Sequence, residues 1–319
     1  MATHGLSDAG SKIPQVEISC FSNNPNNDLC KNLVNAQRAV SSKRIGSYGI
    51  KVKDNILVCG GVSEATRSPI LNCDTLKSLQ LWNQASVTFR EGKTYAASAQ
   101  TLFGEFFVTG GFTGNLDNNY LSDEVSSRTQ IIVNEKLIKD GPDLPKALAC
   151  HSMIHIEDRY FMISGGIDTK FRLASPGSFY INYVTGDYLE LPLMELGRAN
   201  HAALKHVSEY DREMRIFVAG GRHFSTQGSI GSNIQTLYTK TTEIFLPKNR
   251  TWTQGPDLPF TLAFASVVYT PKGNWIVGGK TDPNNINSVS FSFPFIEFGH
   301  IPTIRYCRLL CIFLVYLKS

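Results

Sequence analysis

Histidines are the side chains in this sequence best suited to metal binding or proton transfer. His151 and His155 are four positions apart, so on a β-strand they would share one face. They would then lie about 13 Å apart, because a strand advances about 3.3 Å per residue, and one metal ion could not join them. Cys307 and Cys311 have the same spacing within an apolar tail. We therefore predict no metal site and no cofactor.

Nucleotide-binding and hydrolase motifs are also missing. The segment GGKT at 278–281 resembles the end of a phosphate-binding loop, but the earlier glycine that this motif requires falls at Asn274. The sequence contains no G-x-S-x-G and no H-E-x-x-H motif. We predict no catalytic residues, which favours a protein that is not an enzyme.

Composition excludes further classes. Apolar residues make up 42% of the 319 residues, which indicates a folded chain, and the net charge of +4 gives no sign of a nucleic-acid-binding face. The apolar stretch at 309–317 is too short to cross a bilayer as a helix, so we predict no membrane span.

Cysteine use and the first residues bear on the compartment. Seven cysteines, an odd number without framework spacing, favour a reducing compartment, and residues 1–19 lack the pattern of a signal peptide. We therefore expect a cytoplasmic protein. The glycosylation sequon at Asn249 favours the alternative, an extracellular protein whose leader is missing from this sequence.

A short phrase, an apolar run that ends in two glycines, occurs five times. The first glycines stand at 60, 110, 165, 220 and 278, so the copies are 50, 55, 55 and 58 residues apart. A regular period of this length is typical of a repeat architecture. The architectural glycines that we predict are Gly60, Gly61, Gly110, Gly111, Gly165, Gly166, Gly220, Gly221, Gly278 and Gly279.

Each repeat reads as a small antiparallel sheet. The run before the glycines is rich in β-branched and aromatic residues, which predicts a strand buried on both faces. A second apolar segment precedes this strand and is connected to it by a short turn, so the two are expected to form a β-hairpin. A third strand is predicted at 78–82, 129–133, 178–184, 242–246 and 288–293, and a fourth follows in most copies. Four such strands in about 50 residues describe one blade of a propeller.

These features resemble the kelch repeat, in which Gly-Gly is followed by two spaced aromatic residues and a Leu-Pro turn. The best copy is Phe245, Trp252 and Leu258-Pro259, and Trp82 with Phe89 keeps the spacing. Weaker residues keep it at 131 and 138 and at 181 and 188. The resemblance covers about 16–292 and implies an all-β propeller.

The number of blades has two solutions. We predict a tail at 1–15, a propeller at 16–293 and a divergent apolar tail at 294–319. The propeller comprises a segment of third and fourth strands at 16–36 and repeats at about 38–90, 92–144, 146–192, 197–258 and 260–293. We favour a six-bladed plan with an incomplete or divergent C-terminus. The alternative is a closed ring of five blades.

The resemblance also implies where a partner binds. Kelch propellers often hold ligands at one mouth, through an arginine just before each inner strand. By register this position is Arg44, Thr94, Leu148, Arg198 and Leu262 in the five repeats. Arg44 and Arg198 would face each other across a six-bladed ring and suit an acidic peptide. The alternative is that both are solvated or pair with a local carboxylate such as Glu195.

The histidines also recur in register. His151 and His201 occupy the same repeat position, and we favour a structural role in the inner strand over a metal or catalytic one. Together with Arg44, Thr94 and Arg198 they complete the predicted partner-binding set.

The sequence therefore predicts a non-catalytic protein-interaction module. It would bind a partner protein or peptide through the loops at one mouth. Because some kelch-like propellers are enzymes, a carbohydrate or redox enzyme is the main alternative, and a secreted or ectodomain propeller is another.

Overall fold

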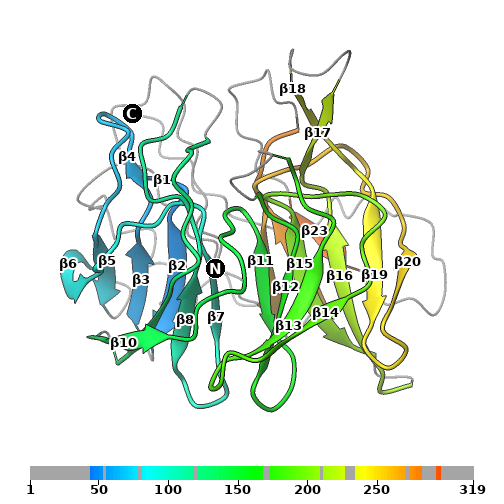
Figure 1. Ribbon diagram of the computed structural model, residues 1–319, viewed down its shortest axis with the longest axis horizontal. Helices are drawn as coiled ribbons and strands as arrows, with labels where there is room; N and C mark the ends of the chain where they lie inside the picture. Colours follow the sequence, from blue (N-terminus) through cyan, green and yellow to red (C-terminus); the bar gives the residue numbers. More distant parts are fainter. Residues whose placement is uncertain are drawn as a thin grey trace, which may run out of the picture.

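The computed structural model describes residues 44–52, 55–77, 81–117, 121–134, 136–167, 173–208, 211–226, 234–270, 273–281 and 292–295. Its described residues form antiparallel sheets that stand side by side as the blades of a propeller (Figure 1). In chain order we call the five main sheets blades 1 to 5. The apolar, β-branched composition of the repeats is the physical reason for these strands.

Four blades have four strands each. Blade 1 contains β2 (Tyr48–Val52), β3 (Asn55–Cys59), β5 (Asn72–Lys77) and β6 (Leu81–Thr88). Blade 2 contains β7 (Ala97–Gln100), β8 (Phe106–Thr109), β9 (Thr129–Val133) and β10 (Lys136–Gly141). Blade 3 contains β11 (Ser152–His155), β12 (Tyr160–Ser164), β13 (Ser178–Asn182) and β14 (Tyr188–Leu191). Blade 4 contains β15 (Ala202–Val207), β16 (Met214–Ala219), β19 (Thr242–Leu246) and β20 (Thr251–Gln254).

The described part of blade 5 has three strands, β21 (Ser266–Thr270), β22 (Gly273–Val277) and β23 (Ser292–Phe295). Two smaller pairings lie outside the blades. One joins β1 (Arg44–Ile45) to β4 (Val62–Ser63), and the other is a hairpin of β17 (Arg222–Thr226) and β18 (Ile234–Tyr238). This hairpin projects from the end of the propeller at which the glycine pairs lie (Figure 1).

The core lies between consecutive blades. In blades 1 to 4 the second strand, just before the glycines, is the most deeply buried, and all four residues of β8 are buried. Apolar clusters fill the spaces between blades 1 and 2, 2 and 3, 3 and 4, and 4 and 5. A blade therefore buries both faces only because it has neighbours, as expected for a repeat protein.

A chain of backbone hydrogen bonds joins the blades near their inner strands. The N–H of Tyr95 donates to the carbonyl of Gly46, that of Cys150 to Tyr95, that of Asn200 to Cys150 and that of Phe264 to Asn200, at 2.8–2.9 Å. All five residues have positive φ, between 52° and 67°, in the left-handed region. One residue per blade thus links β2, β7, β11, β15 and β21, which contact one another in that order.

Two predicted strands differ from the structure. The third strand of blade 1 is β5, which precedes the predicted segment 78–82, and Trp82 lies on the fourth strand. The sequence of β5, NCDTLK, is largely polar, so the strand could not be recognised as an apolar run. The third described strand of blade 5 is 292–295 instead of 288–293. Residues 294 and 295 of the predicted tail 294–319 belong to this strand. The predicted segment 16–36 and the rest of the tail lie outside the described residues, so the choice between five and six blades stays a prediction.

Candidate functional site

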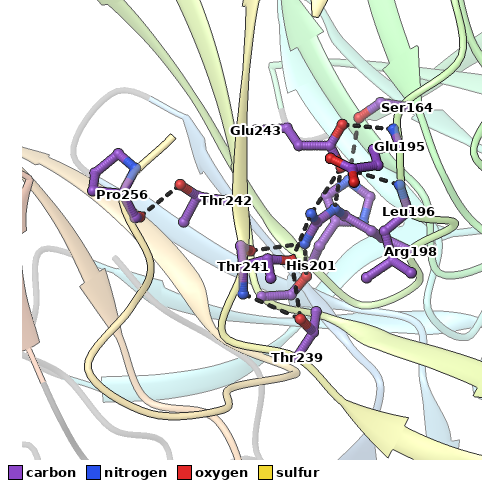
Figure 2. A network of polar contacts seen from close by, with 11 residues as sticks. Ser164, Glu195, Leu196, Arg198, His201, Thr239, Thr241, Thr242, Glu243 and Pro256 are labelled. Carbon is purple, nitrogen blue, oxygen red and sulfur yellow. Dashed lines mark hydrogen bonds and ion pairs between the residues drawn. The ribbon is translucent and has the colours of Figure 1, made fainter. Parts of the chain in front are cut away.

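The two arginines predicted at the mouth are buried inside their own blades. Arg198, whose side chain is 1% exposed, forms an ion pair of 2.8 Å with Glu243 on β19. Its guanidinium also donates to the carbonyls of Gly220 and Thr241, at 2.8 Å each, and to the Thr241 hydroxyl at 2.9 Å. Figure 2 shows the guanidinium between Glu243 and Thr241. All five N–H groups of the guanidinium therefore have hydrogen-bond acceptors within blade 4.

Arg44 makes the same arrangement in blade 1. It pairs with Asp74 on β5 at 2.9 Å and donates to the carbonyls of Gly60 and Asn72. In both blades the cation caps the carbonyl of the first glycine and meets an acid on the third strand. Arg44 and Arg198 thus hold a blade together, and their burial gives no support to the predicted partner-binding role, which stays a prediction. The carboxylate that pairs with Arg198 belongs to Glu243 and not to the predicted Glu195. The backbone N–H of Glu195 donates to the same Glu243 carboxylate.

Thr94, the third predicted contact residue, is one position out of register. The N–H of the second glycine in a blade donates to the carbonyl of the equivalent residue in the next blade. These acceptors are Lys93, Leu148, Arg198 and Leu262, at 2.7–2.8 Å. Lys93, and not Thr94, is therefore the counterpart of Arg198. Thr94 is fully buried and its backbone bridges to Phe112.

Lys93 behaves as its position requires. Its ammonium donates to the carbonyls of Gly110 and Arg128 at 3.0 and 2.9 Å and lies 3.1 Å from the Glu91 carboxylate. Burial lowers the pKa of Lys93, and the Glu91 charge opposes that shift. Three blades thus carry a buried cation at this position. The sequence signal that we missed is a lysine one residue before Thr94.

The residue facing this position changes with it. Strand pairing places Asp74, Gln130, Phe179 and Glu243 at equivalent sites of the third strands. Blades 1 and 4 combine an arginine with an acid, whereas blade 3 combines Leu148 with Phe179 in one apolar cluster. The repeat therefore accepts either an ion pair or an apolar pair here, which is a structural alternation and not a ligand-binding pattern.

His151 and His201 join neighbouring blades. The Nε2 of His151 lies 2.9 Å from the Thr109 hydroxyl of blade 2, and the Nε2 of His201 lies 3.1 and 3.2 Å from the hydroxyls of Ser152 and Ser164 in blade 3. Burial lowers the pKa of each histidine to about 3, with smaller contributions from Lys93 and Arg198 respectively. Both rings are thus neutral at physiological pH. Their placement supports the structural role that we favoured, and each histidine is buried.

The glycine pairs form the joints between blades. All ten glycines adopt positive φ. A Cβ on Gly110 would stand 2.1 Å from the carbonyl oxygen of Leu148 in the next blade, and one on Gly165 would stand 2.3 Å from that of Arg198. Because a backbone oxygen cannot move aside cheaply, only glycine fits here. The repeated phrase is therefore architectural.

The residue that follows each glycine pair differs between blades. It is Val62, Phe112 and Ile167 in the first three blades, but Arg222 in blade 4 and Lys280 in blade 5, all buried. The Arg222 guanidinium donates to the Asn200 side chain at 2.7 Å and lies 5.1 Å from the Phe264 ring centre. Arg222 begins the β17–β18 hairpin, so the structure anchors this projecting element to the backbone chain that joins the blades.

One cysteine pair was not expected. Cys59 on β3 and Cys73 on β5 are cross-strand partners and form a disulfide in the core of blade 1. The spacing analysis found no disulfide framework because it missed β5, which carries Cys73. Within the described ranges no group of three or more His, Cys, Asp or Glu side chains is placed to hold a metal ion, and no helix there is long and apolar enough to span a bilayer.

Comparisons with known proteins support the fold. No family model matches the chain. Beta-scruin of Limulus polyphemus, a kelch-repeat protein, is 25% identical over 234 residues, which cover 71% of this chain and 24% of Beta-scruin. The matched region thus spans about a quarter of that relative's length. The solved structure of YjhT, a kelch-type propeller, has a TM-score of 0.64 at 14% identity and covers 80% of this chain and 82% of its own.

The fold prediction is confirmed by three independent observations. The five Gly-Gly copies each end the second strand of a sheet, the sheets stand in sequence order around joined inner strands, and both comparisons lead to kelch proteins. The chain has the fold of a β-propeller, and its repeats are similar to those of kelch proteins.

Proposed function

We propose that this propeller is a non-catalytic protein-interaction module that binds a partner protein through blade-specific loops at its Gly-Gly end. The observation that carries the proposal is the contrast between repeated and unique parts at that end. The cations, histidines and glycines that recur make contacts that hold the blades together. The β17–β18 hairpin, by contrast, is seen in blade 4 alone among the described residues, and it projects outward.

The relative with a kelch repeat supports the same class of function, because repeat platforms of this kind present variable loops on a fixed frame. The burial of Arg44 and Arg198 removes the reason for expecting an acidic partner. The chemistry of the partner would then be set by the hairpin and the neighbouring loops.

Site-specific photo-crosslinking tests this proposal. A photoreactive amino acid is placed at Gln235, an exposed residue of β18, and in a matched variant at Lys139, an exposed residue of β10 on the outer strand of blade 2. In lysate of the source cells we expect a discrete crosslinked partner from position 235 and none from position 139. Equal crosslinking from both positions, or a discrete partner only from position 139, would contradict the proposal.

A further inference from the structure

Two junctions between blades differ at the end opposite the glycine pairs. At the junction of blades 2 and 3, which we call the closed junction, the Tyr183 ring fills the space between blades. Its centre lies 5.2 Å from that of Phe107, 5.0 Å from that of Phe161 and 6.1 Å from that of His155. Tyr183 is only 6% exposed. Four aromatic rings thus pack against one another there.

The junction of blades 3 and 4, which we call the open junction, has different side chains at the equivalent positions. Strand pairing aligns Phe161 with Ile216 and Ile181 with Phe245, so Pro247 takes the place of Tyr183. By the same alignment Met162 replaces Phe107, and Lys205 replaces His155. The four aromatic rings of the closed junction are thus replaced by side chains without an aromatic ring, whereas Phe245, which lies 5.1 Å from the Trp252 ring centre, brings an aromatic ring to the position of Ile181. A groove of about 760 Å³ lies at this junction.

Tyrosines line the blade 3 side of the groove. Tyr160 and Tyr188 are 41% and 54% exposed, and Tyr180 is half-buried between them and blade 4. Burial raises the pKa of Tyr180 to about 12, so its hydroxyl stays protonated and able to donate a hydrogen bond. Aromatic faces with protonated hydroxyls suit a ligand that has apolar rings and exposed carbonyl groups.

Charges at the groove are unequal. Five carboxylates and three cations line it, and on the blade 4 side Asp211 pairs with Arg215 and Glu213 with Lys248. On the blade 3 side, Glu157, Asp158 and Asp187 form an acidic edge beside the tyrosines. Among the described residues no ion pair involves any of these three. The acidic edge is thus complementary to a basic group of a ligand.

We propose that the open junction binds an extended, proline-rich segment of a partner protein, with a basic side chain of that segment against the acidic edge. A polyproline helix has no internal hydrogen bonds, so its carbonyls are free to accept from tyrosine hydroxyls. Its rings pack on aromatic faces at low cost in conformational entropy. The groove lies at the start of β12, whereas the glycine pair follows its end. The site is therefore separate from the loops of the proposed function.

Fluorescence anisotropy with a labelled synthetic peptide tests the proposal on the full chain. The peptide has a Pro-x-x-Pro core flanked by one arginine, and a second peptide carries glutamate in place of that arginine. We expect the arginine peptide to bind and the glutamate peptide to bind roughly tenfold more weakly, which equals 1.4 kcal/mol. Saturable binding of a β-linked trisaccharide with no binding of either peptide would identify a sugar site and overturn the proposal.

Variants locate the binding. Tyr188→Ala should weaken the arginine peptide roughly tenfold, as expected for loss of an aromatic anchor. Glu157→Gln combined with Asp158→Asn should remove most of the preference for arginine over glutamate, and Asn tolerates the positive φ of 48° at position 158. The matched control is Glu105→Gln, which changes the residue of the closed junction that is equivalent to Tyr160. Circular dichroism establishes that each variant is folded.

Equal affinity of Tyr188→Ala and the unchanged chain, or an effect of Glu105→Gln as large as that of the groove variants, would overturn the proposal. So would failure of the unchanged chain to bind the arginine peptide. The crosslinks from position 235 do not involve this groove, so they report on the proposed function independently.

Discussion

The closed and open junctions are built from the same strands in the same register, yet one is filled and the other is hollow. At both, a histidine of the later blade bonds a hydroxyl of the earlier blade, and the second glycine of the earlier blade donates to a carbonyl of the later blade. The difference lies at the opposite end of the strands, where Tyr183 is replaced by Pro247.

This difference teaches where the propeller keeps its freedom to vary. The joint at the glycine end tolerates few changes, because backbone atoms of neighbouring blades approach too closely for a Cβ. The other end is joined mainly by side chains, by packing and, between blades 3 and 4, by a hydrogen bond of 3.2 Å from the Lys205 ammonium to the Ile156 carbonyl. There the exchange of a few residues converts filled core into a binding surface without altering the fold.

The largest effect is expected at the joint of the open junction. Arg198→Leu gives blade 4 the residue type that blade 3 has at this position, Leu148, and leaves the Glu243 carboxylate buried without its cation. Stability should fall by about 3–5 kcal/mol, the usual result of breaking a buried pair. Urea unfolding followed by circular dichroism measures the loss.

A double variant supplies the control. Arg198→Leu with Glu243→Phe recreates the Leu148 and Phe179 combination of blade 3, so we expect it to regain more than half of the lost stability. If the double variant is as unstable as Arg198→Leu, the two positions do not alternate as a pair and our reading of the blades is wrong.

The aromatic filling of the closed junction comes next. Tyr183→Ala removes a buried ring together with its hydrogen bond of 3.1 Å to the Asp158 carbonyl, and should cost about 3 kcal/mol. Pro247→Ala, at the same position of the open junction, should cost less than about 1 kcal/mol. Similar losses in the two variants would show that both junctions are equally packed and would remove the contrast.

The histidine bridges should make both junctions sensitive to acid to a similar extent. The folded state holds the pKa of His151 and His201 near 3, below the ordinary 6.5, so the unfolded chain binds more protons between these values. Stability is therefore lost as the pH falls from about 6.5 toward 3. At pH 5 each histidine should contribute a loss of about 2 kcal/mol relative to neutral pH.

Thermal unfolding of His151→Gln and His201→Gln checks this dependence. Each variant should flatten the decline in melting temperature between pH 7 and pH 5 by a similar amount. A variant with an unchanged pH profile would mean that its histidine is not held neutral in the folded protein.

The architecture could be predicted from the sequence because the glycine pairs mark the one point in each blade where side chains are excluded. Burial of the second strand on both faces produces the apolar run before each pair, so four-stranded blades followed directly. The strand β5 was missed because its residues, including Asp74 and Cys73, are polar or small, and the disulfide with Cys59 was missed with it.

The site was less predictable. Arg44 and Arg198 were correctly placed before their inner strands, but their partners Asp74 and Glu243 lie 30 and 45 residues along the chain. Only the fold shows that these carboxylates meet the arginines. Thr94 was chosen in place of Lys93 because the distance from the cation to the first glycine varies from 16 to 22 residues between blades. No sequence motif marks the groove, because it forms where the aromatic side chains of the closed junction are replaced by other residues.

The most direct test of the comparison is to close the open junction. Pro247→Tyr gives the open junction the residue type that the closed junction has at the equivalent position, Tyr183. The new ring should pack between blades 3 and 4. Binding of the arginine peptide, measured by anisotropy, should weaken at least tenfold while the chain keeps its circular dichroism spectrum. Unchanged affinity of the Pro247→Tyr variant would contradict the account, because the groove would then not be where the peptide binds.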